Sequence, residues 1–321
     1  QAVDNRKLIV FADNRQDAAF QAAWMADHAR RYRLRHMIYL IIKDASSPMS
    51  IGDIQRRLQE QLKKNNDLAR ALAPEVFVGE VEEKFTTHLD DQMKRYLRIL
   101  LIRELVTSFS KSENLEGWGK AKVIYYVLDE SDGTVQDLAV KYGISTTDLV
   151  LGIENLLDVF RRQGHFYDPV EPIFTQRWSE GSPDVLRGYL PYRDYPPKGL
   201  KLRREGNDKK DYITQLLSDR GSTLVQHLAR KWGVEEGQIT DFVEDIWSAL
   251  VSKWKLLKSV TLIDHRGRPL PGSSGAYQVD SSQIGIVIQN EKFVCNICGR
   301  SHTRATPRMV CTAYNCRGHL E

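Results

Sequence analysis

The stretch LAVKYGI at Leu138–Ile144 returns 90 residues later as LARKWGV at Leu228–Val234. The register continues without a gap, since Leu149 matches Ile239 and Ile153 matches Val243 at the same offset. Each copy is predicted to form a helix, a short helix, a glycine turn and a third helix, which is the core of a helix-turn-helix unit. The glycine permits the positive φ of the turn, and the alanine lets two helices approach closely.

Strand-like sequence follows the second copy, at residues 256–263 and 276–288, on either side of a turn at residues 266–269. Two strands joined in this way are typical of the wing that follows a helix-turn-helix core. The sequence therefore predicts two winged-helix domains, at residues 115–175 and 208–290. Proline, glycine and charged residues are frequent between them, which predicts a linker at residues 176–207.

The N-terminal part of the chain has a different pattern. Residues 7–12 (KLIVFA) form an apolar run typical of a strand that is buried on both faces of a parallel sheet, and a helix is expected from Ala18 to about Lys43. A parallel strand needs neighbours from other strand-helix units, and no second unit of that kind is evident in the sequence. We therefore expect residues 1–45 to be one piece of a larger sheet domain, followed by a helical insert at residues 46–114 whose first helix is capped by Ser50.

Composition narrows the class of protein. The chain has 321 residues, 41% of them hydrophobic, and a formal net charge of +4, which is compatible with nucleic-acid binding without requiring it. Neither a secretory signal nor a membrane span is predicted. All four cysteines fall within the last 27 residues, whereas secreted disulfide-stapled proteins usually distribute their cysteines. We therefore expect a cytoplasmic protein that does not enter a membrane.

The cysteines have the spacing of metal ligands. They form a C-x2-C pair and a C-x4-C pair with twelve residues between the pairs: Cys295, Cys298, Cys311 and Cys316. Two such pairs can close a tetrahedral zinc site, whereas free thiols or a redox pair would not explain two clusters. The x4 spacing is unusual, so His302 or His319 could replace one thiolate. Because four protein ligands leave no open position, we expect a structural zinc in a module at residues 291–321, and a metal-dependent hydrolase is disfavoured.

A family resemblance lies at the N-terminus. The segment LIVFADNRQDAAFQAAWMADHARR (residues 8–31) resembles the start of the second motor domain, around motif IV, in large superfamily 2 DEAD/DEAH-box helicases. It looks most like long bacterial helicases with extra winged-helix and cysteine-rich modules, some of which serve in phage defence. The close resemblance covers residues 3–36, and a looser one covers NLEGWG (residues 114–119) and the cysteines.

This resemblance implies a strand-helix start of a RecA-like domain whose loop grips the translocated DNA strand. The residues carried over to that contact are Asn14, Arg15 and Gln16, although Asp13 and Asp17 would serve equally well as helix caps. The phosphate loop of the family is absent from the chain, so ATP and Mg²⁺ would bind only in other motor parts. The acidic sequence VLDESD (residues 127–132) is interpreted as a surface turn and a helix cap.

Charge distribution suggests where DNA would bind. The third helices of both repeat copies are acidic, so we expect them to pack against protein rather than read bases. Phosphate contacts are instead predicted in the wing and the cysteine module, with a solvated surface or a dock onto the motor domains as the alternative for the module. The predicted residues are Arg266, Arg268, Arg300, Arg304 and Arg308.

The expected fold is thus mainly α (α+β): a RecA-like strand-helix start, a helical insert, tandem winged helices and a zinc knuckle module. The expected function is an accessory, DNA-positioning segment of a large ATP-dependent helicase, inactive as an ATPase alone and binding DNA without sequence specificity beside the remaining motor domains. The alternative is a protein-interaction scaffold of a defence or repair complex, which docks a partner subunit through its acidic winged-helix faces.

Overall fold

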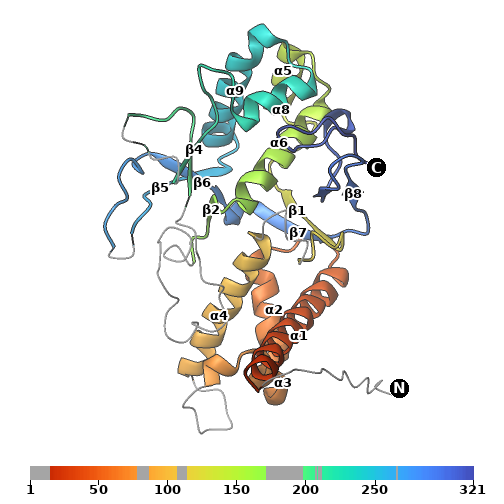
Figure 1. Cartoon of the computed structure of the whole chain (residues 1–321), viewed down its shortest axis with the longest axis vertical. Coiled ribbons are helices and arrows are strands. Elements are labelled where there is room, and N and C mark those ends of the chain that lie inside the picture. The colour runs from red at the N-terminus through yellow and green to blue at the C-terminus, as the bar shows by residue number, and fades with distance from the viewer. Residues whose placement is uncertain are drawn as a thin grey trace.

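The structure is a computed structural model, and it describes residues 15–77, 87–106, 114–170, 198–206, 208, 212–264 and 267–321. Helix predominates over strand among these residues. Figure 1 shows a layer of helices at one end, a pair of helical repeats at the other end, and β-structure between them. The predicted N-terminal strand at residues 7–12 lies outside the described residues.

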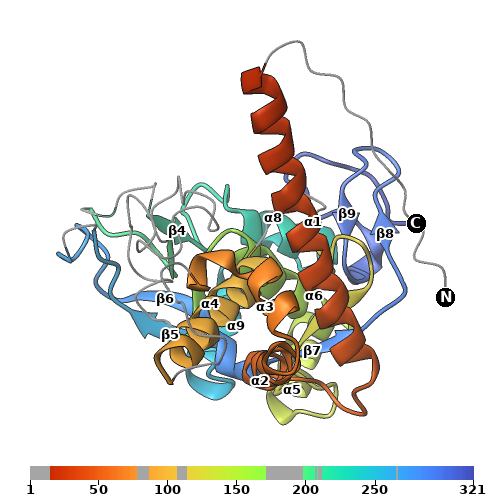
Figure 2. The ribbon, with the colours of Figure 1, turned by 90° about the horizontal axis from the view of Figure 1, so that it is seen from below.

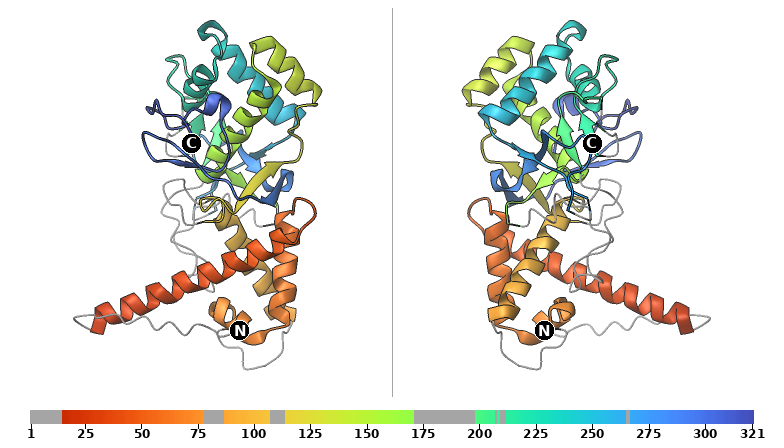
Figure 3. Two further views of the ribbon diagram at one scale, coloured as in Figure 1. Left: turned by 90° about the vertical axis from the view of Figure 1, so that its right-hand side faces the viewer. Right: turned by 90° about the vertical axis from the view of Figure 1, so that its left-hand side faces the viewer.

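The helical layer contains α1 (Arg15–Lys43), α2 (Ile51–Lys63), α3 (Asn66–Leu72), η1 (Pro74–Phe77) and α4 (Thr87–Leu105). Ser50 caps α2 as predicted, because its Oγ accepts the Asp53 N–H at 3.1 Å. The apolar stripe of α2, with Ile54 and Leu58 fully buried, packs against α4. Burial of each such side chain contributes roughly 1.5–3 kcal/mol. The N-terminal half of α1 projects beyond the other helices (Figures 2 and 3).

The two repeats form the opposite end. The first contains α5 (Gly133–Tyr142) and α6 (Thr146–Arg162), and the second contains α8 (Leu224–Trp232), η3 (Glu236–Gln238), α9 (Ile239–Ser248) and the π-helical turn η4 (Ala249–Lys253). The glycine turns are as predicted, with φ of +63° at Gly143 and +94° at Gly233.

The predicted first helix of each copy is wrong. A strand stands in its place, β1 (Ala121–Tyr125) before α5 and β4 (Ile213–Gln215) before α8. In β1 the buried side chains alternate with half-buried ones, so the apolar positions have the period of a strand and not that of a helix.

The β-structure joins the two copies. β6 (Ala276–Asp280) pairs with β2 (Phe166–Tyr167), β3 (Gly199–Lys201) and β5 (Leu257–Val260) in a curled five-stranded sheet that β4 completes beside β3. The antiparallel β5–β6 pair lies where the wing was predicted. After the short turn η5 (Ser281–Gln283), β7 (Ile284–Ile288) pairs with β1 along its whole length.

These pairings correct the predicted domain boundaries. β1 and β2 of the first copy pair with β7 and β6, which follow the second copy, and both copies contribute to one hydrophobic core. Part of the predicted linker is the strand β3, which is fully buried. It fits there because Gly199 has no Cβ, and a Cβ at this position would lie 2.6 Å from the Cβ of Ala276. The two copies are therefore halves of one folded unit.

The C-terminal residues 291–321, called the cysteine module below, contain β8 (Phe293–Val294), β9 (Ser301–His302) and η6 (Pro307–Met309). β8 and β9 form an antiparallel pair, and η6 contacts both α6 and α8. Figure 1 shows the module, in dark blue, against the side of the paired repeats. In the described part of the chain, every helix is too short or too polar to cross a membrane.

Candidate metal centre

The four cysteines come together as the sequence predicts. Their Sγ atoms all lie within 4.8 Å of one another. Two of the contacts cross between the pairs, at 3.5 Å for Cys295 and Cys316 and 3.6 Å for Cys298 and Cys311. Zinc–sulfur bonds of about 2.3 Å in a tetrahedron place sulfur atoms about 3.8 Å apart, whereas a disulfide needs about 2 Å. The geometry therefore matches four ligands around one ion.

The two cysteine pairs, at residues 295–298 and 311–316, are called the first and second knuckle below. Backbone N–H groups point at the sulfur atoms in both of them. The Cys295 Sγ accepts the N–H of Ile297 at 3.4 Å and of Cys298 at 3.5 Å. In the second pair, Cys311 Sγ accepts from Ala313 at 3.4 Å and Cys316 Sγ from Gly318 at 3.3 Å. Such bonds favour the thiolate, which is the form that binds a metal.

Gly318 is also required by space, because a Cβ on it would overlap the Cys295 Sγ. A residue with a side chain at this position would push one sulfur away from the other three. The glycine two residues after Cys316 therefore lets the two cysteine pairs approach each other.

Burial and hydrogen bonding act differently on the thiols. Burial disfavours ionisation of Cys295, but the N–H groups of Cys298 and Ile297 lower its pKa to about 6. Burial raises the pKa of Cys311 to about 12. A bound cation would overcome this cost, since a metal ion favours the thiolate of every ligand. The four-cysteine group could thus hold a metal ion such as zinc. Neither His302, whose Nε2 lies 3.6 Å from Cys311 Sγ, nor the exposed His319 belongs to that group.

A lysine of the second repeat holds the second knuckle in place. Lys231, near the end of α8, donates its Nζ to the carbonyl oxygens of Cys311, Ala313 and Cys316 at 2.7–3.1 Å. Its ammonium thereby satisfies carbonyls of the knuckle and places a positive charge beside four thiols. This contact was not evident in the sequence, where Lys231 is one of many basic residues.

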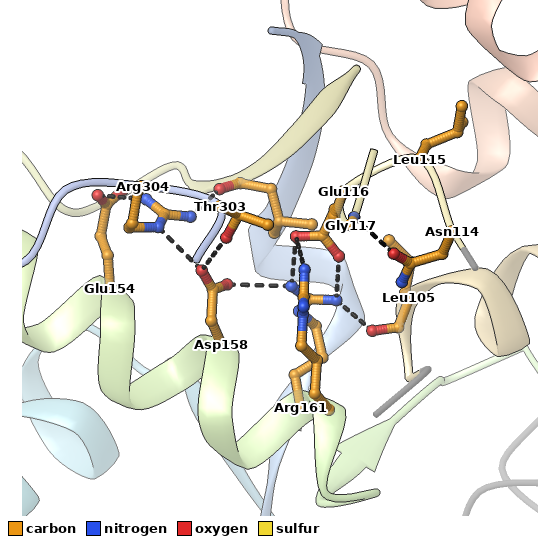
Figure 4. Close-up of polar contacts among 12 residues, drawn as sticks. Leu105, Asn114, Leu115, Glu116, Gly117, Glu154, Asp158, Arg161, Thr303 and Arg304 are labelled. Atoms are coloured by element: carbon orange, nitrogen blue, oxygen red, sulfur yellow. Dashed lines mark hydrogen bonds and ion pairs between the residues drawn. The ribbon is translucent and has the colours of Figure 1, made fainter. Parts of the chain in front are cut away.

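A second anchor attaches the module to α6. Arg304 is buried, donates its Nε to Asp158 at 2.9 Å and forms a close ion pair with Glu154 (Figure 4). Asn155 donates its side-chain amide to the Ala305 carbonyl at 2.8 Å. The segment Thr303–Ala305 is called the anchor segment below. It covers one face of α6.

The same network continues into the core. Arg161, fully buried, makes a two-pronged ion pair with Glu116 at 2.8 Å for each contact and also reaches Asp158 at 3.0 Å. Asp158 further accepts the Tyr125 hydroxyl at 2.9 Å. Burial opposes ionisation of Asp158, but the guanidinium groups of Arg304 and Arg161 hold its pKa at about 2. The carboxylates and guanidinium groups of this network are thus buried and paired with one another, as expected of a structural ion-pair network.

The NLEGWG motif at residues 114–119 supplies Glu116 to this network. Asn114 Oδ1 accepts the Gly117 N–H at 2.6 Å, and Glu104 of α4 accepts the Leu115 N–H at 2.8 Å. Glu104 also pairs with Arg35 of α1 at 2.9 Å. The motif thus connects the helical layer, α6 and the cysteine module.

The residues predicted to bind nucleic acid differ in where the structure places them. Asn14 and Arg266 lie outside the described residues, and Arg15 and Gln16 begin α1 with side chains that the structure does not describe. Arg268 is exposed and pairs with Asp264 at 2.9 Å. Arg300 and Arg308 are exposed on the cysteine module.

The structure corrects the prediction for Arg304. Its side chain is only 6% exposed and its guanidinium is paired with Asp158 and Glu154. A phosphate contact would need this buried group to leave two carboxylates, so the prediction of DNA contact is wrong for Arg304. The sequence shows the arginine but not that the chain folds back over α6 at this residue.

The acidic third helices are placed unequally. On α6, the acidic side chains Glu154 and Asp158 are covered by the anchor segment. On α9, Asp241 and Glu244 are exposed to solvent. The acidic turn at residues 127–132 behaves as predicted, since Asp129 and Glu130 are exposed there and Asp132 caps α5 by accepting the Val135 N–H at 3.0 Å. Comparison of the chain with protein-family models, curated proteins and solved structures found no match.

Proposed function

We propose that this chain is an accessory segment of a large superfamily 2 DNA helicase, in which it positions DNA while motor parts elsewhere hydrolyse ATP. The observation that supports this most directly is that the arginines of the cysteine module differ in burial. Arg304 anchors the module to α6 and Arg308 lies over the turn at Gly233, while Arg300 and Arg317 are exposed. A rigidly held module with outward arginines is suited to non-specific contact with phosphates.

The described part of α1 supports the same proposal. Its C-terminal half is packed, with Leu34, Met37 and Ile38 buried, while its N-terminal half projects from the body (Figure 2). The helicase resemblance expects this end of α1 to pack on a parallel sheet of the motor. The projecting half leaves such a sheet access to the helix.

We further propose that the ion in the cysteine site is zinc and that its role is structural. Four thiolates in a tetrahedron are typical of structural zinc, and they leave no position for substrate water. The purified chain should contain one zinc per molecule by elemental analysis. Chelation should release the cysteine module and lower the stability of the whole chain, since the anchors on α6 and α8 belong to the same segment.

DNA binding tests the main proposal. We expect the full chain to bind fluorescein-labelled duplex and forked DNA, with an affinity that falls steeply with salt concentration. Replacement of both Arg300 and Arg317 by Gln should weaken binding about tenfold and reduce the magnitude of the salt slope by about 2, as expected for two lost phosphate contacts.

The matched control removes two charges elsewhere, by Arg57→Gln and Lys64→Gln on the exposed side of the helical layer. Equal loss of affinity in the control would show that only net charge matters. Undetectable DNA binding by the unmodified chain at low salt would contradict the proposal.

A second function is favoured by the exposed acidic face of α9. Carboxylates at this surface repel phosphates, so a protein partner is the more suitable occupant. We therefore propose, as a second candidate, that the chain also docks a partner subunit through this face. Capture of a partner that survives loss of the module arginines would separate this function from DNA positioning.

A further inference from the structure

The two repeats pack against each other with an internal two-fold relationship. Tyr142, at the end of α5, packs edge-on against Phe242 of α9 with ring centroids 5.0 Å apart. The residues 90 positions away make the reciprocal contact: Trp232 ends α8, and its ring lies against Gly152 of α6, where an added Cβ would be 3.0 Å away. A surface of the first repeat therefore corresponds to the surface of the second repeat that is formed by the residues 90 positions later.

In the first repeat, this surface is a face of α6, and it is covered by the cysteine module. The anchor segment lies on α6, where Arg304 binds Glu154 and Asp158. Four residues further on, Arg308 extends over the glycine turn of α8, where a Cβ on Gly233 would overlap its guanidinium. Two arginines four positions apart thus connect a third helix of one repeat to the glycine turn of the other.

On the other side, the same helix face is exposed among the described residues. The positions of α6 at 151, 154, 155 and 158 correspond to positions of α9 at 241, 244, 245 and 248, which lie on one face at helical spacing. Their side chains are Asp241, Glu244, Asp245 and Ser248, and they are exposed or half-exposed. Among the described residues, nothing lies within 4 Å of a Cβ built on the neighbouring turn glycine, Gly143.

Charge identifies the kind of occupant. Glu244 is the counterpart of Glu154, which binds Arg304, and its own contact is a 3.3 Å pair with the half-exposed Arg203. Lys141, the counterpart of Lys231, reaches Asp245 at 2.6 Å with its side chain 53% exposed, whereas Lys231 donates to carbonyls of the docked module. The open face therefore offers carboxylates for guanidinium groups and an ammonium for backbone carbonyls.

We propose that the α9 face, together with the Gly143 turn, binds an extended segment of a partner protein that carries two arginines four positions apart. This inference rests on the second proposed function and names its surface and partner chemistry. The partner segment would lie as residues 303–308 lie on α6, with one arginine at Glu244 and the other over the C-terminal carbonyls of α5, where a helix end favours positive charge. A nucleic acid does not fit, because phosphates would face carboxylates.

The test uses the full zinc-loaded chain and a fluorescein-labelled peptide of residues 301–310, SHTRATPRMV. We expect binding by fluorescence anisotropy at low salt and no binding of the same peptide with both arginines replaced by glutamine. Replacement of Asp241 by Asn together with Glu244 by Gln should weaken binding about tenfold, which corresponds to about 1.4 kcal/mol. Hydrogen exchange should show peptide-induced protection of α9 and the Gly143 turn.

A matched control carries Glu60→Gln and Asp91→Asn, two exposed acids of the helical layer. Equal weakening in this control, or binding that is indifferent to the α9 substitutions, would overturn the assignment of the site while leaving partner docking in place. Failure of the unmodified chain to bind the peptide would overturn the partner chemistry. Protection of the α9 face by self-association of the chain, seen by sedimentation, would overturn the proposal as well. Because none of these readouts involves DNA, their failure is separate from failure of DNA positioning.

Discussion

Trp232 lies against Gly152 of the opposite repeat, so closely that a Cβ on the glycine would be 3.0 Å from the indole ring. The position 90 residues after Gly152 is Phe242, which packs against Tyr142. The repeats therefore use a large ring against a glycine at one contact and two rings at the other. The small glycine accommodates the larger tryptophan ring, so that both repeats can pack around a shared core.

Replacement of Gly152 by Leu should lower the free energy of unfolding by about 1–3 kcal/mol, because the new side chain would overpack the Trp232 contact. Urea denaturation followed by tryptophan fluorescence would measure the change. Val140→Leu, at a position 85% exposed, is the control and should change stability by less than about 0.5 kcal/mol. Equal effects of the two substitutions would show that the contact does not hold the repeats together.

Replacement of Gly318 by Ala should impair metal binding, since a Cβ there would overlap the Cys295 sulfur. We expect the purified variant to contain less than one zinc per chain and to lose zinc faster to a chromogenic chelator. Gly237→Ala provides the comparison, because a Cβ at that position meets nothing within 4 Å among the described residues. Full zinc occupancy with unchanged release by the Gly318 variant would argue against a four-thiolate site.

Replacement of Asp158 by Asn should destabilise the chain by about 3–5 kcal/mol, because it leaves buried Arg161 and Arg304 without a shared counter-charge. Combination with Arg304→Gln should cost less than the sum of the two single changes. A coupling of about 0.5–3 kcal/mol is expected in the double-mutant cycle. Strict additivity in denaturant unfolding would mean that the ion pair does not link the cysteine module to α6.

His165 makes the folded chain sensitive to acid. Burial, with a smaller contribution from the charge of Lys198, lowers its pKa to about 3, and the ring contacts the Phe160 carbonyl and the Thr214 hydroxyl. In the unfolded chain His165 binds a proton near its ordinary pKa of 6.5, whereas in the folded chain it does not. The contribution of His165 to the free energy of unfolding is therefore complete above pH 6.5 and is lost as the pH decreases toward 3. The loss at pH 5 should be about 2 kcal/mol.

The measurement compares urea unfolding of the unmodified chain and of His165→Gln at pH 7.5 and pH 5. The variant should be less stable at pH 7.5 but should lose about 2 kcal/mol less on acidification. His36→Gln, at an exposed position, should keep the full pH dependence. An unchanged pH dependence in the His165 variant would contradict the assignment.

Local sequence determined the features that depend on near neighbours. The Ser50 cap, the glycine turns at Gly143 and Gly233, and the C-x2-C and C-x4-C knuckles were all predicted, and each is present. Their geometry follows from backbone rules within a few residues: a capping oxygen, a positive φ, or two thiols on a tight turn.

Tertiary structure decided which distant segments meet. The pairing of β1 with β7 joins residues more than 150 positions apart, and the burial of Arg304 depends on the chain returning over α6. No local pattern carries this information, because strand partners and buried ion pairs are selected by the total burial and charge balance of the folded chain. The repeat predicted two similar units, but only the tertiary structure shows, through the shared strands, the common core and the contact of Trp232 with Gly152, that they fold as one.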